Sequence, residues 1–156
     1  MTESARILII DDDPNVLGTF STALRGEGYE VDIAADGRSA IEKSKANFYN
    51  LALIDIRLPD MEGTRLLTEM RETTPKMVKI IVTGYPSLQN AIESLNKGAD
   101  GYIIKPAQTE ELIKMLREHL REQQEEKRYS EQKIKEYVDT RIMQLETQKQ
   151  SNPNQP

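Results

Sequence analysis

The 156-residue sequence has no cysteine, no tryptophan and few aromatic side chains, which make up 5% of it. Without cysteine, disulfide bonds and thiolate metal sites are excluded. Because only two Phe and six Tyr are present, the core must consist mainly of Leu, Ile, Val and Ala. No apolar run approaches the ~20 residues of a membrane-spanning helix, so we expect no membrane partner.

A strongly basic surface is missing as well. Lys and Arg number 21 against 26 Asp and Glu, which gives a net charge of −5. Proteins that bind nucleic acid directly carry a basic patch or stripe, so we expect no direct contact with DNA or RNA. The first four residues lack the basic start and apolar core of a signal peptide. A soluble, cytoplasmic protein is therefore expected.

Short apolar runs alternate with segments of helical period along the first 120 residues. Strands are expected near Ala5–Ile10, Glu30–Ala34, Leu51–Ile54, Met77–Val82 and Gly101–Ile104. A helix is expected after each strand, with start signals at Pro14, Gly37, Gly63, Ser87 and Thr109. This alternation is typical of βα units, so the sequence predicts an α/β fold with a five-stranded parallel sheet.

The last helix is predicted to be unusually long, because no Gly or Pro follows Thr109 until Pro153. Its first turns carry a core face of Leu112, Ile113, Met115, Leu116 and Leu120. A second apolar stripe of Ile134, Val138, Ile142 and Leu145 has the spacing of an amphipathic helix or short coiled coil. We therefore expect a domain over residues 1–121, an extended helix over 122–149 and a disordered tail over 150–156.

Carboxylates follow two of the predicted strands. The first strand runs into Asp11, Asp12 and Asp13, and the third ends at Asp55. The carboxyl ends of parallel strands share one edge of a sheet, where open α/β sheets place their ligands. Two carboxylates about 4 Å apart repel by roughly 4 kcal/mol at an effective dielectric near 20, so such a cluster favours a bound cation.

Two further polar residues follow strands at the same edge, Thr83 after the fourth and Lys105 after the fifth. The motifs at these strand ends are Ile-Ile-Asp-Asp-Asp (9–13), Leu-Ile-Asp-Ile-Arg-Leu-Pro-Asp-Met-Glu-Gly (53–63), Val-Thr-Gly (82–84) and Lys-Pro (105–106). Together and in this order, they resemble the receiver domain of two-component response regulators. The resemblance covers residues 5–121 and implies the doubly wound, flavodoxin-like (βα)5 fold of that family, with the last helix extended.

The resemblance implies a phosphorylation site. Asp55 would be the phosphoacceptor, and Mg²⁺ would be held by Asp11, Asp12, Asp55 and the backbone carbonyl of Arg57. Such a set of oxygen ligands suits Mg²⁺. Lys105 would offset the charge of the phosphoryl group, and the Lys105–Pro106 bond would be cis.

The resemblance also implies a switch and partners. The Thr83 hydroxyl would hydrogen-bond a phosphoryl oxygen, and Tyr102 would move into the space that Thr83 leaves. A sensor histidine kinase or phosphotransfer protein would supply the phosphoryl group, and an unidentified downstream protein would respond. The protein would then catalyse only its own phosphorylation and dephosphorylation. A separate hypothesis is that Arg57 and Tyr85, which flank the expected path of the hydrolytic water, slow its attack.

Several alternatives stay open at this stage. A Mg²⁺-dependent phosphohydrolase with an aspartyl nucleophile would use Asp11 and Asp13, which stand two residues apart, but the Gly-Thr that follows in such enzymes is missing. A scaffold or dimerisation module that is never phosphorylated is a second alternative. The stripe from Ile134 to Leu145 would form a homodimer, dock a partner or belong to a linker that continues beyond this sequence.

Overall fold

The computed structural model describes residues 4–151, and their side chains as far as residue 150. Over this range strands and helices alternate along the chain. The strands are β1 (Arg6–Ile10), β2 (Glu30–Ala34), β3 (Leu51–Ile54), β4 (Val78–Thr83) and β5 (Gly101–Ile104). The helices are α1 (Pro14–Gly26), α2 (Gly37–Ala46), α3 (Gly63–Glu69), α4 (Leu88–Asn96) and α5 (Thr109–Ser151). The predicted strands are confirmed to within one residue at each end.

All strands pair in parallel in the order β2-β1-β3-β4-β5. The chain moves from β1 outward to β2 and then returns past β1 to β3, so β1 and β3 form the switch point of the sheet. Their register pairs Ile10 with Ile54, and the register of β4 and β5 pairs Thr83 with Ile104. The residues that follow these pairs therefore meet at one edge, where such folds bind ligands.

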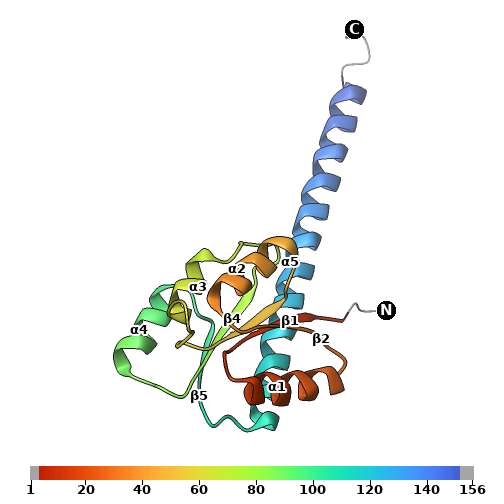
Figure 1. Ribbon diagram of the computed structural model, residues 1–156. Coiled ribbons are helices and arrows are strands. Elements are labelled where there is room, and N and C mark those ends of the chain that lie inside the picture. Colours follow the sequence, from red (N-terminus) through yellow and green to blue (C-terminus); the bar gives the residue numbers. More distant parts are fainter. Residues whose placement is uncertain (1–3, 152–156) are drawn as a thin grey trace. The chain divides into compact units, whose positions relative to one another are not determined.

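The sheet separates two layers of helices (Figure 1). Along β1, Ile7 and Ile9 point into one hydrophobic cluster while Leu8 and Ile10 point into the other, as the alternation of a strand requires. The first cluster includes buried residues of α1 and the first turns of α5. The second includes residues of α2 and α3. Both faces of the sheet are thus covered, which confirms the doubly wound fold.

The sequence signals for α1 and for the start of α5 are confirmed. Leu17, Phe20 and Leu24 are buried on one face of α1. On α5, Leu112 and Leu116 are buried, and the other residues of the predicted core face, Ile113, Met115 and Leu120, are packed against the same cluster.

Helix α4 forms where its periodicity predicts it, but its large apolar side chains lie in water. Leu88, Ile92 and Leu95 are 79%, 49% and 64% exposed. The side chain that α4 buries is Ser94, whose hydroxyl donates a hydrogen bond to the carbonyl of Asn90. Periodicity predicts which side chains share a face of the helix. It does not predict whether that face packs against the sheet or faces solvent.

The chain divides into two compact units, Met1–Leu120 and Arg121–Pro156. Helix α5 runs through the boundary and continues to Ser151. Gln150 and Ser151, the first residues of the predicted tail, are therefore helical, because nothing before Pro153 breaks the helix. The rest of that tail lies outside the described residues. Among the described helices, none is long and apolar enough to cross a membrane.

Candidate functional site

Asp11 and Asp55 lie side by side at the carboxyl edge of the sheet. The Asp55 amide donates to the Ile10 carbonyl over 2.9 Å, and the Asp11 amide donates to the Ala34 carbonyl over 3.1 Å. These backbone bonds extend the ladders between neighbouring strands by one residue. Both aspartates are almost fully buried, with 3% and 6% of their surfaces exposed. The fold thus forces two carboxylates together in a poorly solvated place.

A third carboxylate, that of Asp12, joins them. One carboxylate oxygen from each of Asp11, Asp12 and Asp55 lies within 4.8 Å of the other two, a spacing that lets a single cation contact all three. Asp12 is exposed, so the cluster opens to solvent on its side. These hard oxygen ligands suit a divalent cation such as Mg²⁺ or Ca²⁺.

Asp13 has a different role from its two neighbours. Its carboxylate accepts a hydrogen bond of 2.9 Å from the Asn15 amide and caps α1. Its own amide donates to Asp11 Oδ1 over 2.9 Å. The third aspartate of the run therefore starts the helix and orients Asp11. It is not one of the three carboxylates that meet in the cluster.

Lys105 reaches both buried carboxylates. Its Nζ lies 2.5 Å from Asp11 Oδ2 and 3.3 Å from Asp55 Oδ2. The Lys105 amide donates to the Thr83 carbonyl over 2.8 Å, which continues the pairing of β4 with β5. The Lys105–Pro106 peptide bond is cis. One ammonium group thus contacts both buried carboxylates and reduces the repulsion between them.

The electrostatics of the site follow from this crowding. Burial, and then the charge of Asp11, raise the pKa of Asp55, while Lys105 opposes the shift. Burial lowers the pKa of Lys105, but its hydrogen bond to Asp11 and the charges of both carboxylates outweigh burial and raise it. The raised pKa of Lys105 favours its charged form, and additional positive charge near Asp55 would favour the ionised form of that carboxylate.

Thr83 and Tyr102 lie on neighbouring strands, and each is held by a hydrogen bond. Thr83 is fully buried, and its Oγ1 accepts a hydrogen bond of 3.0 Å from the Tyr85 amide. The Tyr102 hydroxyl donates to Asn90 Oδ1 over 2.5 Å. Asn90 also donates from Nδ2 to the Tyr85 carbonyl over 2.9 Å. Hydrogen bonds therefore connect the two predicted switch residues through the start of α4.

Sequence reasoning missed the residues that shape the loop after β3. The Asp60 carboxylate accepts hydrogen bonds from the Gly37 amide (2.8 Å) and the Arg38 amide (3.0 Å) at the start of α2. These two amides lower the pKa of Asp60. A Cβ added at Gly63 would lie 1.8 Å from the Asp55 carbonyl oxygen. Both residues belong to the motif 53–63, so the signal was in the sequence, but the contacts it encodes are not local.

A second contact beside the site joins residues from two loops. The guanidinium carbon of Arg57 lies 3.8 Å from the centre of the Tyr85 ring, within the range of a cation–π interaction. The Arg57 amide donates to Asp55 Oδ1 over 3.3 Å. Arg57 is therefore tied to the carboxylate through its backbone and to Tyr85 through its side chain.

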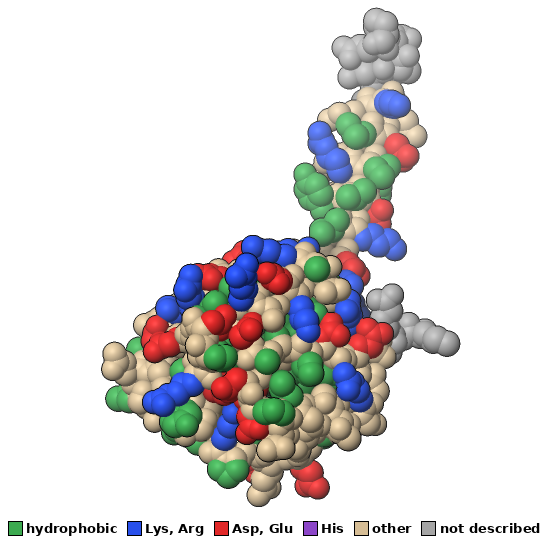
Figure 2. Space-filling model, viewed as in Figure 1, with side chains coloured by type: hydrophobic (Ala, Val, Ile, Leu, Met, Phe, Trp, Pro, Cys, Tyr) green, Lys and Arg blue, Asp and Glu red, His purple; other side chains and the backbone are tan. Residues whose placement is uncertain are grey.

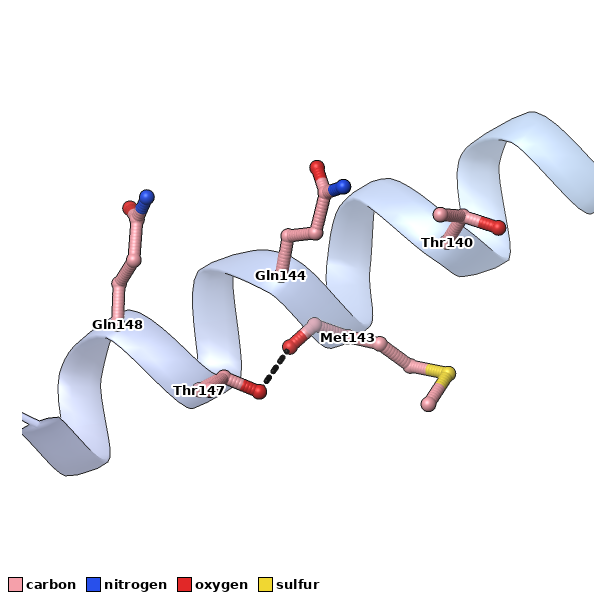
Figure 3. Close-up of a pocket in the computed structure, with 5 residues that line it drawn as sticks. All are labelled: Thr140, Met143, Gln144, Thr147 and Gln148. Atoms are coloured by element: carbon pink, nitrogen blue, oxygen red, sulfur yellow. Dashed lines mark hydrogen bonds between the residues drawn. The ribbon is translucent and has the colours of Figure 1, made fainter.

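A groove on the C-terminal part of α5 is unrelated to these residues. Its lining comes from about two turns of one helix, as Figure 3 shows, and consists of Thr140, Met143, Gln144, Thr147 and Gln148. The Thr147 hydroxyl donates to the Met143 carbonyl over 2.9 Å. The lining contains no carboxylate, ammonium or imidazole group. The carboxylate cluster is thus the better candidate for chemistry.

Comparison with known proteins shows the family of this chain. Residues 7–117 match the response regulator receiver domain family. A CheY-like response regulator receiver domain protein from Methanospirillum hungatei shares 49% identity, with a TM-score of 0.77 over 80% of this chain and 99% of that one. A response regulator from Burkholderia pseudomallei, solved with a phosphorylated aspartic acid, a calcium ion and citrate, shares 28% identity and a TM-score of 0.69 over 79% and 72% of the two chains.

Curated relatives are longer than this chain. Response regulator ArlR of Staphylococcus saprophyticus is 38% identical over 120 residues, which are 76% of this chain and 53% of that protein. Two other relatives are covered over only 24% and 27% of their length. The chain thus matches only about a quarter to a half of the length of these relatives. The chain belongs to the response regulator receiver domain family of two-component signalling.

Proposed function

We propose that Asp55 accepts a phosphoryl group from a phosphohistidine of a sensor histidine kinase or phosphotransfer protein. A carboxylate oxygen of Asp55 attacks the phosphorus, the phosphorus–nitrogen bond breaks, and the imidazole leaves with the electron pair and takes up a proton. The observation that carries this proposal is the contact of Lys105 Nζ with both Asp11 and Asp55. An ammonium group there can balance the negative charge that a phosphoryl group adds.

The proposal includes a Mg²⁺ ion held by Asp11, Asp12, Asp55 and the backbone carbonyl of Arg57. The three carboxylates fit this role, because one oxygen of each lies within 4.8 Å of the others. When bound, Mg²⁺ would offset the charge on the oxygens of the transferring phosphoryl group. The phosphorylated aspartic acid and calcium ion of the Burkholderia pseudomallei relative support the same combination here, since both cations take oxygen ligands.

We further propose that Thr83 and Tyr102 transmit phosphorylation to a binding surface. The Thr83 hydroxyl donates to a phosphoryl oxygen, and Tyr102 shifts with it, so that phosphorylation biases two arrangements of this region. The connection through Tyr85 and Asn90 supports this coupling. The exposed apolar side chains of α4, Leu88, Ile92 and Leu95, suit contact with a downstream protein.

In this proposal the two parts of the chain have different functions. Residues 1–121 act as the receiver domain, and residues 122–149 act as a helical extension through which two copies associate. Output occurs through protein–protein contact in the cytoplasm, without direct binding of nucleic acid or membrane. The absence of a basic excess, with a net charge of −5, supports this view.

Beryllofluoride binding tests the proposal, since this complex mimics a phosphoryl group on aspartate. Titration in the presence of Mg²⁺, followed by fluorine NMR, should give a saturable signal with the natural sequence and none with Asp55→Asn. Asp13→Asn is the matched control, because it removes a neighbouring carboxylate that caps α1, and it should retain the signal. Binding that persists in Asp55→Asn would contradict the proposal.

A further inference from the structure

One face of the helical extension carries an ordered pattern of apolar and charged residues. Ile134, Val138, Ile142 and Leu145 recur at intervals of three or four residues and are 64%, 45%, 48% and 45% exposed. Such spacing places side chains on one face of a helix. Hydrophobic side chains line part of the extension among charged ones in Figure 2. The apolar face is therefore available to a partner.

The same spacing continues to a charged residue at each end of the stripe. Glu131 lies three residues before Ile134, and Lys149 lies four residues after Leu145. The pattern is nearly symmetric about Thr140, because Glu131 and Lys149 are equally distant from it and apolar residues occupy the positions between. One end of the face is acidic and the other is basic.

An antiparallel pair of these helices would use this symmetry. Suppose that a two-fold axis crosses the pair at the level of residue 140 along the helix. Val138 of one copy then lies opposite Ile142 of the other, and Ile134 lies opposite Leu145. Glu131 then lies opposite Lys149. The contact is isologous, because each copy contributes the same surface, and such closed two-fold contacts are the commonest in soluble oligomers.

A second pair of charges obeys the same symmetry. Successive residues of a helix are about 100° apart around its axis, which places Lys135 and Glu146 beside the stripe, on the side where Glu131 and Lys149 lie. Lys135 and Glu146 also lie at nearly equal distances from Thr140. In the antiparallel pair each therefore approaches the opposite charge of the other copy.

The parallel arrangement lacks these contacts. In a parallel pair in register, Glu131 faces Glu131 of the other copy, and Lys149 faces Lys149. Like charges opposite each other disfavour such pairing. In a parallel pair, Lys135 of one copy would face the other edge of the partner's stripe. Tyr137 and Gln144 lie along that edge, and neither carries a carboxylate that Lys135 could contact. Charge thus distinguishes the two orientations.

We infer that a second copy of this chain occupies the face from Glu131 to Lys149, in antiparallel orientation and centred near Thr140. The inference specifies the self-association proposed above and is independent of phosphoryl transfer at Asp55. Failure of the experiments below would leave the proposal for Asp55 unchanged, because no phosphoryl donor, cation or mimic is used in them.

Charge reversal tests the register in the full-length chain. Glu131→Lys alone and Lys149→Glu alone place like charges opposite each other, and each should raise the dissociation constant of the dimer about tenfold in sedimentation equilibrium. The double variant restores opposite charges and should recover the original value. Glu136→Lys, with the same change of charge on the opposite side of the helix, is the matched control and should leave it unchanged. A double variant that dimerises no better than either single variant overturns the pairing.

Disulfide formation tests the orientation, because the sequence contains no cysteine. An equimolar mixture of the Ile134→Cys and Leu145→Cys variants should form a mixed disulfide under mild oxidation, while each variant alone should stay largely uncrosslinked. Efficient crosslinking of each variant alone would show parallel pairing and overturn the inference. A natural chain that is monomeric at every concentration would overturn both this inference and the proposed self-association.

Discussion

The guanidinium group of Arg57 stacks on the ring of Tyr85, 3.8 Å from the ring centre to the guanidinium carbon. Arg57 follows β3 and Tyr85 follows β4, so the stack joins the two loops beside Asp55. Both side chains are largely exposed. We propose that a stack in this place restricts the approach of water to the phosphoryl group that Asp55 is proposed to carry.

Loss of the stack should speed hydrolysis of the aspartyl phosphate. A cation–π contact at an exposed site is worth about 0.5–1 kcal/mol, and 1 kcal/mol corresponds to about fivefold in rate. Arg57→Ala and Tyr85→Ala should each accelerate dephosphorylation by up to about fivefold, whereas Tyr85→Phe, which keeps the aromatic face, should resemble the natural chain. The rate is measured as loss of the phosphorylated form by gel mobility. An unchanged rate in both alanine variants counts against the shielding role.

Replacement of Asp55 should stabilise the fold at neutral pH. Burial and the charge of Asp11 raise the pKa of Asp55 above its ordinary value of 3.8, so the folded protein holds the charged carboxylate at a cost that the unfolded chain does not have. Asp55→Asn should therefore raise the free energy of unfolding at pH 7, by about 1 kcal/mol, the usual scale for single substitutions. Urea unfolding with and without the substitution measures the difference.

The pH dependence of this difference has a definite sign. As the pH falls through the raised pKa, the folded protein takes up a proton on Asp55 and the cost is lost, so the gain from Asp55→Asn should vanish near pH 3.8 and below. Mg²⁺ should reduce the gain at pH 7, because a cation stabilises the carboxylate. A gain that increases towards low pH would show that the pKa of Asp55 is lowered.

Gly63→Ala should be strongly destabilising. The added Cβ would lie 1.8 Å from the carbonyl oxygen of Asp55, so either β3 or the start of α3 must move. We expect a loss of more than about 2 kcal/mol in the free energy of unfolding. Gly18→Ala is the matched control, because it lies inside α1 with nothing within 4 Å of the added Cβ, and it should stabilise by about 0.5–1 kcal/mol. Equal effects in urea unfolding would contradict the close approach.

Asp60 should matter beyond its role as a helix cap. Its carboxylate joins the loop that carries Arg57 to the start of α2, whereas Asp36 caps the same helix by accepting from the Ser39 amide. Either residue changed to Ala should lower the stability of the fold. Only Asp60→Ala should speed hydrogen exchange of the Arg57 amide and weaken Mg²⁺ binding, by about threefold or more, in calorimetric titration. Equal effects of Asp60→Ala and Asp36→Ala on Mg²⁺ affinity would contradict a specific role of Asp60 at the cation site.

Much of the fold could be predicted from the sequence because its signals are local. Aliphatic runs such as Leu51–Ile54 sit in buried parallel strands, and Pro14, Ser87 and Gly98 mark helix ends at or next to the positions where the structure has them. The exposure of Leu88 and Leu95 could not be predicted, because it depends on how α4 is placed against the rest of the fold. Periodicity contains no information about that placement.

The candidate site, like the fold, could be predicted from the sequence only in part. Parallel strands end at one edge, so the meeting of Asp11 with Asp55 and Lys105 was predictable from their positions after strands. The bonds of Asp60 to α2 and the stack of Arg57 on Tyr85 were not. Each depends on a side-chain direction or on contact between loops that are distant in sequence, and one sequence alone does not reveal either.

The central claim is that Asp55 is the phosphoacceptor, and chemical trapping tests it most directly. The protein is incubated with acetyl phosphate and Mg²⁺ and then treated with borohydride, which reduces an aspartyl phosphate to homoserine at the modified position. Peptide mass spectrometry should find homoserine at residue 55, only when Mg²⁺ was present, and nowhere in Asp55→Asn. Homoserine at Asp11 or Asp13, or none at all in protein that remains folded, would contradict the account.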